Sequence, residues 1–193
     1  MRICLLLTLS LAASPAMAQS IDPSYSLPAT CRALSYVPAD ARIDTPALAA
    51  KVSTAMCAVG QGMDRLALRD DDASRVALEQ AAAPAFAALD EAARSNHPEW
   101  QIAAEHLRGE LYVAMTVRMR NAIPPLGPTI GPSLAQLTQR HDALELQLTP
   151  WREGSTAAFA AVRRIAAAHP EATRDPVAAY AVRDSALPIV AAR

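Results

Sequence analysis

The chain has 193 residues, with 18 basic and 19 acidic side chains and a formal net charge of −1. This balance, without a polybasic run, gives no reason to expect binding to nucleic acid or to an anionic membrane surface. Hydrophobic residues make up 52% of the chain. A chain of this size is long enough for one ordinary domain with its own core.

The first 18 residues have the pattern of a secretory signal peptide. Arg2 supplies a positive charge, an apolar run extends from Ile3 to Ala13, and residues 16–18 read Ala-Met-Ala, a small-residue cleavage site. The apolar run is shorter than the ~20 residues of a transmembrane helix. We therefore expect cleavage near Ala18 and a mature chain that does not span a membrane. The predicted location is the periplasm or the extracellular medium.

Residues 19–41 predict an irregular N-terminal arm, because three prolines interrupt this stretch. The arm contains Cys31, which with Cys57 is one of the two cysteines that remain after cleavage. In an oxidising compartment two such cysteines are expected to pair. A Cys31–Cys57 disulfide would stabilise the protein by roughly 3–4 kcal/mol through closure of its loop. A reactive thiol pair is the alternative, but the chain has no Cys-x-x-Cys motif.

Residues 42–193 predict a single domain of five or six helices. In each predicted helix the apolar residues recur at spacings of three and four, which is the period of an amphipathic helix. The predicted helices cover approximately residues 46–66, 72–95, 98–121, 133–148, 150–169 and 176–187. No segment shows the alternation of a strand. Because helices joined by short turns pack as antiparallel neighbours, we expect an all-α antiparallel helical bundle.

Local signals predict where these helices begin, bend and stop. Asp72 or Ser74 is the expected N-cap of the second helix, and Thr149 that of the fifth. Pro84 lies inside the second helix and is expected to kink or split it. The strongest break is a Pro/Gly-rich loop at 122–132, where four prolines and two glycines exclude regular structure.

Three residues are candidates for ligand binding. His141 lies in the apolar stripe of the fourth helix, which suggests an acid–base group or ligand, or else a core histidine bonded to a neighbour such as Glu145. Met63 and His169 are candidate ligands for a haem held between helices. Covalent haem is excluded because the attachment motif is absent, and a methionine at helical spacing is more often core filler.

A metal hypothesis arises on the third helix, where four potential ligands occur close together: Glu99, Glu105, His106 and Glu110. The chain has neither Glu-x-x-His nor His-Glu-x-x-His, the spacings of well-known metal-binding helices. His106 is expected at the edge of the apolar face, in contact with solvent. We therefore predict no metal site and no bound cofactor.

The predicted function is that of a non-enzymatic binding or scaffolding protein of the cell envelope, because no catalytic motif occurs in the sequence. Its expected partner is another envelope protein, with the loop at 122–132 as a candidate contact surface. One alternative is a carrier of a small ligand or cofactor, haem or metal included, in a cavity between helices. A further alternative is an enzyme that uses His141. A scaffold should show an exposed apolar patch, whereas an enzyme should show a second polar group that converges on His141.

Overall fold

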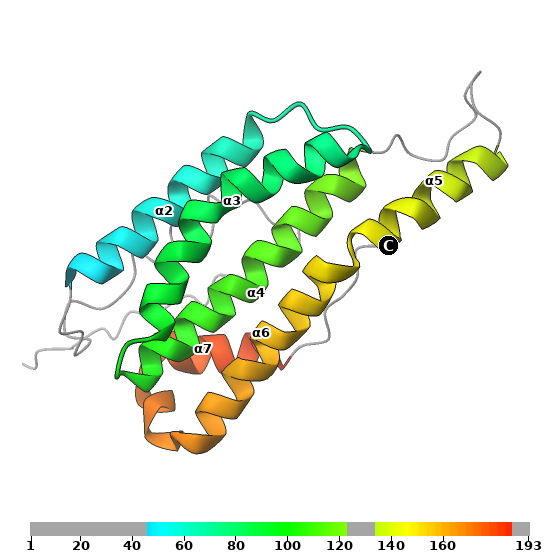
Figure 1. The fold of residues 1–193 in the computed structure, drawn as a ribbon. Coiled ribbons are helices and arrows are strands. Elements are labelled where there is room, and N and C mark those ends of the chain that lie inside the picture. Colours follow the sequence, from blue (N-terminus) through cyan, green and yellow to red (C-terminus); the bar gives the residue numbers. More distant parts are fainter. Residues whose placement is uncertain (1–45, 123–133, 187–193) are drawn as a thin grey trace, which may run out of the picture.

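The computed structural model describes residues 46–122 and 134–186, which form six α-helices and one short 3-10 helix (Figure 1). These are α2 (Pro46–Asp64), α3 (Asp72–Ala93), α4 (Pro98–Asn121), α5 (Leu134–Gln147), α6 (Thr149–Ala168), η1 (Pro170–Arg174) and α7 (Pro176–Ser185). No strand occurs in these two ranges. The predicted all-α bundle is confirmed. The predicted leader, the N-terminal arm with Cys31 and nearly all of the loop at 122–132 lie outside the described residues.

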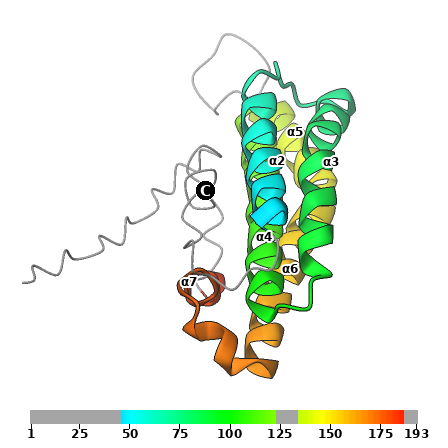
Figure 2. The ribbon, with the colours of Figure 1, turned by 90° about the vertical axis from the view of Figure 1, so that its left-hand side faces the viewer.

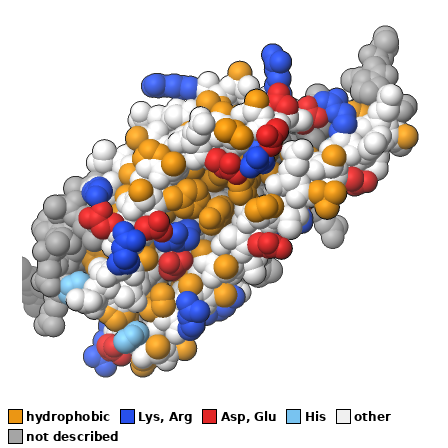
Figure 3. Space-filling model, viewed as in Figure 1, with side chains coloured by type: hydrophobic (Ala, Val, Ile, Leu, Met, Phe, Trp, Pro, Cys, Tyr) orange, Lys and Arg blue, Asp and Glu red, His pale blue; other side chains and the backbone are white. Residues whose placement is uncertain are grey.

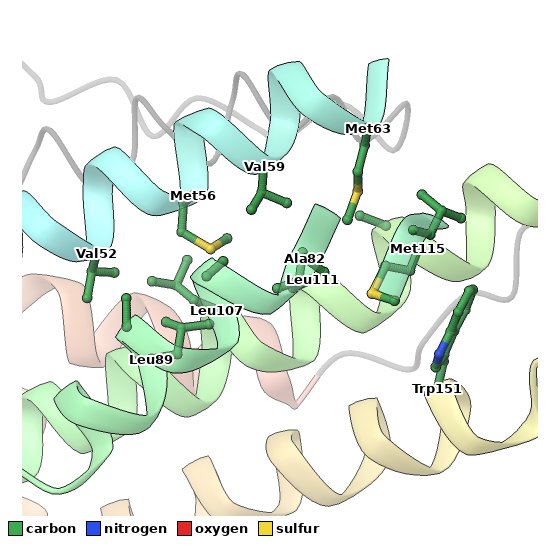
Figure 4. Packing of buried hydrophobic residues seen from close by; sticks show 14 of the residues in the cluster. Val52, Met56, Val59, Met63, Ala82, Leu89, Leu107, Leu111, Met115 and Trp151 are labelled. Atoms are coloured by element: carbon green, nitrogen blue, oxygen red, sulfur yellow. The ribbon is translucent and has the colours of Figure 1, made fainter. Parts of the chain in front are cut away.

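The core of the bundle is built around α4. Helices α3, α6 and α7 pack on α4, and α2 packs on α3. Figure 4 shows the side chains of α2 pointing toward those of α3 and α4. The largest fully buried side chains of this main core are Met56, Met63, Leu78, Leu89, Leu111, Met115, Met119 and Leu148. Among the described residues, no helix has both the length and the apolarity needed to cross a membrane.

A second, smaller apolar cluster joins α7 to the rest of the bundle. Its buried members come from α4, α6, η1 and α7: Ile102, Val162, Ala166, Ala172, Ala178 and Ala181. Figure 2 shows α7 almost end-on, so this helix crosses one end of the bundle instead of running along it. Alanine side chains leave little bulk between helices, and α7 therefore lies close against α4.

Prolines mark the starts of three helices, as the sequence predicts. Pro46, Pro98 and Pro176 are the first residues of α2, α4 and α7. Proline fits this position because the first N–H groups of a helix have no partner within the helix. Before α7, the carboxylate of Asp175 accepts hydrogen bonds from two backbone N–H groups of the first turn, at 2.9 and 3.0 Å. Local sequence signals therefore fix where α7 begins, and α7 is the helix that covers the candidate site described below.

The N-cap of α3 is Asp71, so the prediction of Asp72 or Ser74 was wrong. The Asp71 carboxylate accepts a hydrogen bond from the Ser74 backbone N–H at 2.8 Å. The Ser74 hydroxyl in turn accepts one from the Arg69 backbone N–H at 2.9 Å. Adjacent aspartates make sequence signals for a cap ambiguous, and the conformation of the chain before the helix selects the carboxylate that reaches the first turn.

The start of α6 differs from its prediction, whereas Pro84 has the first of the two effects predicted for it. Residue 148 keeps a helical backbone (φ −84°, ψ −8°) and precedes α6, so Thr149 is not the N-cap. Instead, the Thr149 hydroxyl donates to the Glu145 carbonyl at 3.1 Å, which ties the start of α6 to the end of α5. The two helices consequently follow nearly one line (Figure 1). Pro84 bends α3 but does not split it, because α3 continues on both sides of it.

The contact between α4 and α6 uses two glycines in a reciprocal way. A Cβ atom built on Gly109 of α4 would lie 2.5 Å from Cε1 of Phe159 on α6. A Cβ atom built on Gly154 of α6 would lie 2.7 Å from Cε2 of Tyr112 on α4. Each helix therefore places an aromatic ring over a glycine of the other. This arrangement allows a close approach that two larger residues would prevent.

Candidate metal centre

His106 lies on α4 where α7 covers it, and only 5% of the residue is exposed. The prediction that it is solvated was therefore wrong. Its ring packs at 5.9 Å from the ring of Phe159 and edge-on at 5.7 Å from the ring of Tyr180, measured between centroids. The helical period placed His106 at the edge of the apolar stripe, but α7 extends the buried surface beyond that edge.

Two carboxylates converge on the imidazole of His106. Asp184, near the end of α7, places Oδ2 at 2.9 Å from His106 Nε2. Glu110, one turn further along α4, places Oε1 at 3.9 Å from the same nitrogen. The side chains of His106 and Glu110 are 7% and 8% exposed, and that of Asp184 is 23% exposed. One potential ligand atom from each residue lies within 4.8 Å of the other two.

These distances are close to those of a metal site without matching an occupied one. Ligand atoms about 2.1 Å from a tetrahedral ion lie about 3.4 Å apart. The distance from His106 Nε2 to Asp184 is shorter than this value, at 2.9 Å, and the distance to Glu110 is longer, at 3.9 Å. An ion would therefore have to separate the first pair and draw Glu110 closer through small side-chain rotations. Burial of two carboxylates carries a large desolvation cost unless cations or hydrogen bonds compensate for it. A cation among the three groups would supply that compensation.

Tyr180 adds a fourth polar group beside the cluster. It precedes Asp184 by one turn of α7, so both side chains lie on one face of that helix. The hydroxyl of Tyr180 is buried and has no hydrogen-bond partner among the described residues. Burial, followed by the negative charges of Asp184 and Glu110, raises the pKa of Tyr180 to about 12, against a smaller lowering by Arg183. The phenol thus lies within electrostatic reach of both carboxylates.

Comparison of the chain with protein-family models, curated proteins and solved structures finds no match.

The structure does not bring the predicted haem ligands together. Met63 is fully buried in the main core near the end of α2. His169 follows the last residue of α6, has a side chain 46% exposed, and lies 3.3 Å from the Glu171 carboxylate. Figure 1 places these two helix ends at opposite ends of the bundle. A haem held between Met63 and His169 is therefore incompatible with this fold.

The third candidate, His141, lies half-buried on α5 near Glu145. Glu145 is already held by two arginines: Arg120 of α4 donates to both of its oxygens, at 2.6 and 2.8 Å, and Arg152 of α6 donates at 2.8 Å. The group that the sequence suggested as the partner of His141 therefore serves an ion-pair network between helices. This arrangement favours a structural role for Glu145 over a catalytic one.

This network predicts a pH dependence of stability. Hydrogen bonds from Arg120, with the charges of Arg120, Arg152 and His141, lower the pKa of Glu145 below its ordinary 4.5, against the opposing effect of burial. A lowered folded-state pKa stabilises the protein above pH 4.5, and this stabilisation is lost as the pH falls through the folded value. We expect Glu145→Gln to reduce the free energy of unfolding by about 1 kcal/mol at pH 7.

The free energy of unfolding of Glu145→Gln and of the unsubstituted protein should be measured by urea unfolding over a range of pH. The difference between the two free energies should shrink steadily as the pH falls below 4.5. Glu153→Gln is the matched control, because Glu153 is an exposed carboxylate on α6. It should leave both the stability and its pH dependence nearly unchanged. A difference for Glu145→Gln that stays constant down to pH 3 would contradict the assignment.

The sequence contains part of the evidence for the His106 cluster. His106 and Glu110 are four residues apart on one helix, and Tyr180 and Asp184 have the same spacing on another. Each pair thus shares a helix face. The first pair does not have the spacing of the well-known metal-binding helices, Glu-x-x-His and His-Glu-x-x-His. Asp184 lies 78 residues from His106 along the chain, so no local pattern connects it with that pair.

Proposed function

We propose that this protein is an exported helical bundle that binds a metal ion through His106, Glu110 and Asp184. The observation that carries the proposal is the convergence of one imidazole and two carboxylates, with ligand atoms within 4.8 Å of one another, between α4 and α7. Such a protein is one form of the small-ligand carrier that the sequence predicts as an alternative. It replaces a cavity for haem with a small site for a single ion.

The chemistry of the donor set supports the proposal. An imidazole nitrogen with carboxylate oxygens suits borderline and hard ions such as zinc, iron and manganese. Three protein ligands leave at least one coordination position for a further group. Helix α4 is held on several sides by the core, and α7 is capped by Asp175 and packed through its alanines. Both ligand-bearing helices are thus fixed by contacts that do not involve the site.

Export and the disulfide belong to the same proposal. The pattern of residues 1–18 supports secretion with cleavage near Ala18, and export supports a Cys31–Cys57 disulfide. Cys57 lies on α2, and half of the pair is outside the described residues. We propose that the mature protein acts in the periplasm or outside the cell, where it holds its ion without contact with the reducing cytosol.

Binding of another envelope protein, as a scaffold, is the second candidate function. Figure 3 shows apolar side chains gathered in a band over α4, between α3 and α6, with charged side chains on both sides. Partly buried aromatic residues of α3 and α4, Phe86 and Tyr112, pack together at 4.8 Å between ring centroids. Such a band favours contact with a partner. Metal binding and partner binding use different faces, and one protein can have both functions.

Metal binding is tested first with Zn²⁺ as the probe. The protein is exported by its own leader, purified without reductant, freed of metal with a chelator and titrated by calorimetry. We expect one ion per chain. Asp184→Asn should weaken binding at least about tenfold, because it removes a charged ligand. The asparagine oxygen still accepts a hydrogen bond from His106, so α7 should stay in place. Native and denaturing mass spectra of the same sample give the bound ion, the cleavage site and the state of the thiols.

The matched control is His169→Ala, which removes a histidine from an exposed pair with a carboxylate, Glu171. It should leave the affinity for Zn²⁺ unchanged. If the unsubstituted protein takes up no ion, or if Asp184→Asn binds as well as the unsubstituted protein does, the cluster is a hydrogen-bonded contact between α4 and α7 and the proposal is wrong. A native mass that contains a second protein and no ion would support the scaffold.

A further inference from the structure

We propose that Arg163 of α6 is a positioning residue for the metal site, because it holds the C-terminal end of α7, and with it the ligand Asp184, in place. This inference rests on the proposed function and deepens it, since it names a residue outside the cluster that sets the affinity for the ion. The observation that carries it is a hydrogen bond of 2.6 Å, which a guanidinium nitrogen of Arg163 donates to the backbone carbonyl of Ser185, the residue after Asp184.

Asp184 lies in the part of its helix that is least well held by the helix itself. Helix α7 has only ten residues, and Asp184 and Ser185 are the last two. The last carbonyl groups of a helix have no partner within the helix, and helix ends fray. A ligand at such a position binds an ion well only if the end of the helix is fixed by other contacts.

Arg163 supplies such a contact from a neighbouring helix. Its guanidinium satisfies the Ser185 carbonyl, and a positive charge at the C-terminus of a helix is favourable because of the helix dipole. Ser185 is itself buried, so solvent competes little for this carbonyl. At the other end of α7 the Asp175 carboxylate caps the first turn. A charged side chain therefore holds each end of the helix that carries Asp184.

The contribution of Arg163 should be larger in the ion-bound protein than in the metal-free protein. In the metal-free protein the Asp184 carboxylate is hydrogen-bonded to His106 Nε2 at 2.9 Å, and this bond also ties the end of α7 to α4. An ion between these two groups would bind both atoms and separate them to about 3.4 Å, so their hydrogen bond would be lost. The bond from Arg163 to Ser185 involves neither ligand, and it would remain to hold α7.

The test is a calorimetric titration of the metal-free mature protein and of its Arg163→Ala variant with Zn²⁺. Arg163→Ala should weaken Zn²⁺ binding about tenfold, which is the lower end of the loss that follows removal of an outer-shell partner in metal sites. The urea midpoint of the metal-free protein should change little, because the bond between His106 and Asp184 still holds α7 there. A purely structural role of Arg163 would instead lower this midpoint and leave the affinity unchanged.

Two further variants separate the hydrogen bond from the charge. Arg164→Ala is the matched control, because Arg164 is the next residue of α6, is exposed, and lies about 100° further round the helix. It removes the same charge and should leave the affinity for Zn²⁺ unchanged. Arg163→Lys should recover most of the affinity, because one bond to one carbonyl needs a single N–H donor, which lysine can supply.

A double-mutant cycle connects Arg163 with Asp184. In the Asp184→Asn background, where the charged ligand is already lost, Arg163→Ala should weaken Zn²⁺ binding little further. If Arg163→Ala binds Zn²⁺ as well as the unsubstituted protein does, or if it costs the same factor in both backgrounds, the inference is wrong and the proposed function stands. If the unsubstituted protein takes up no Zn²⁺, the proposed function itself fails, and this inference with it.

Discussion

Replacement of Leu111 by alanine is expected to lower the free energy of unfolding by about 3–5 kcal/mol. Leu111 has no exposed surface and lies on α4, the helix around which the main core is built. Figure 4 shows it among side chains of α2, α3 and α4. Because three helices meet at this residue, the surrounding side chains cannot collapse fully into the space that the substitution leaves. The change should be measured by urea unfolding at neutral pH.

Leu146→Ala is the control for this prediction. It removes the same atoms from a residue on α5 that is 77% exposed, and it should change the stability by less than about 0.5 kcal/mol. If Leu111→Ala and Leu146→Ala lowered the free energy of unfolding equally, α4 would not be the centre of the core in solution.

The second large effect is expected at Gly109, where the ring of Phe159 occupies the space of a side chain. Gly109→Ala should lower the free energy of unfolding by up to about 2 kcal/mol. This is the difference between an overpacking cost of about 1–3 kcal/mol and a gain in helix propensity of about 1 kcal/mol. The thermal midpoint should fall by several degrees. The added methyl group should push Phe159, and with it α6, away from α4. This displacement should also disturb His106, which packs on Phe159.

The chain offers a matched control for this substitution at Gly62. A Cβ atom built on Gly62 of α2 meets nothing within 4 Å. Gly62→Ala should therefore stabilise the protein by about 0.5–1 kcal/mol through helix propensity alone. In addition, Phe159→Leu should relieve part of the effect of Gly109→Ala in a double-mutant cycle. If Gly109→Ala stabilised the protein as much as Gly62→Ala does, Phe159 of α6 would not pack closely on Gly109 of α4 in solution.

The positions of the helices were largely predictable because their signals are local. Pro98 and Pro176 begin α4 and α7, and the apolar period of three and four extends through both. The caps were less predictable. At Asp71 several residues of the right type occur together, and the conformation of the preceding chain decides which of them bonds to the backbone. At Thr149 the preceding residue keeps a helical backbone, so the hydroxyl bonds back to α5 and does not cap α6. A proline inside α3 likewise bends the helix without ending it, since tertiary contacts on both sides hold the two halves.

The candidate site was only half predictable. Helical spacing alone puts His106 beside Glu110, and Tyr180 beside Asp184. It does not indicate that these two pairs face each other. The expectation of a solvated His106 came from a single-helix argument, in which the edge of an apolar stripe faces water. In the folded protein another helix, α7, covers this edge, so His106 is buried.

The sequence by itself thus determined the class of the fold, the approximate positions of the helices in the described residues and most of their first residues. It could do so because hydrogen bonding and side-chain period within a helix depend on neighbours in the chain. Only the tertiary structure decided the site. The period of a helix shows which of its faces is apolar, but it does not specify which helix covers that face. The alanines of α7 pack on α4 and α6, and this packing determines that α7 covers the His106 face of α4. It brings Asp184 to His106 across 78 residues of chain, which no local pattern encodes.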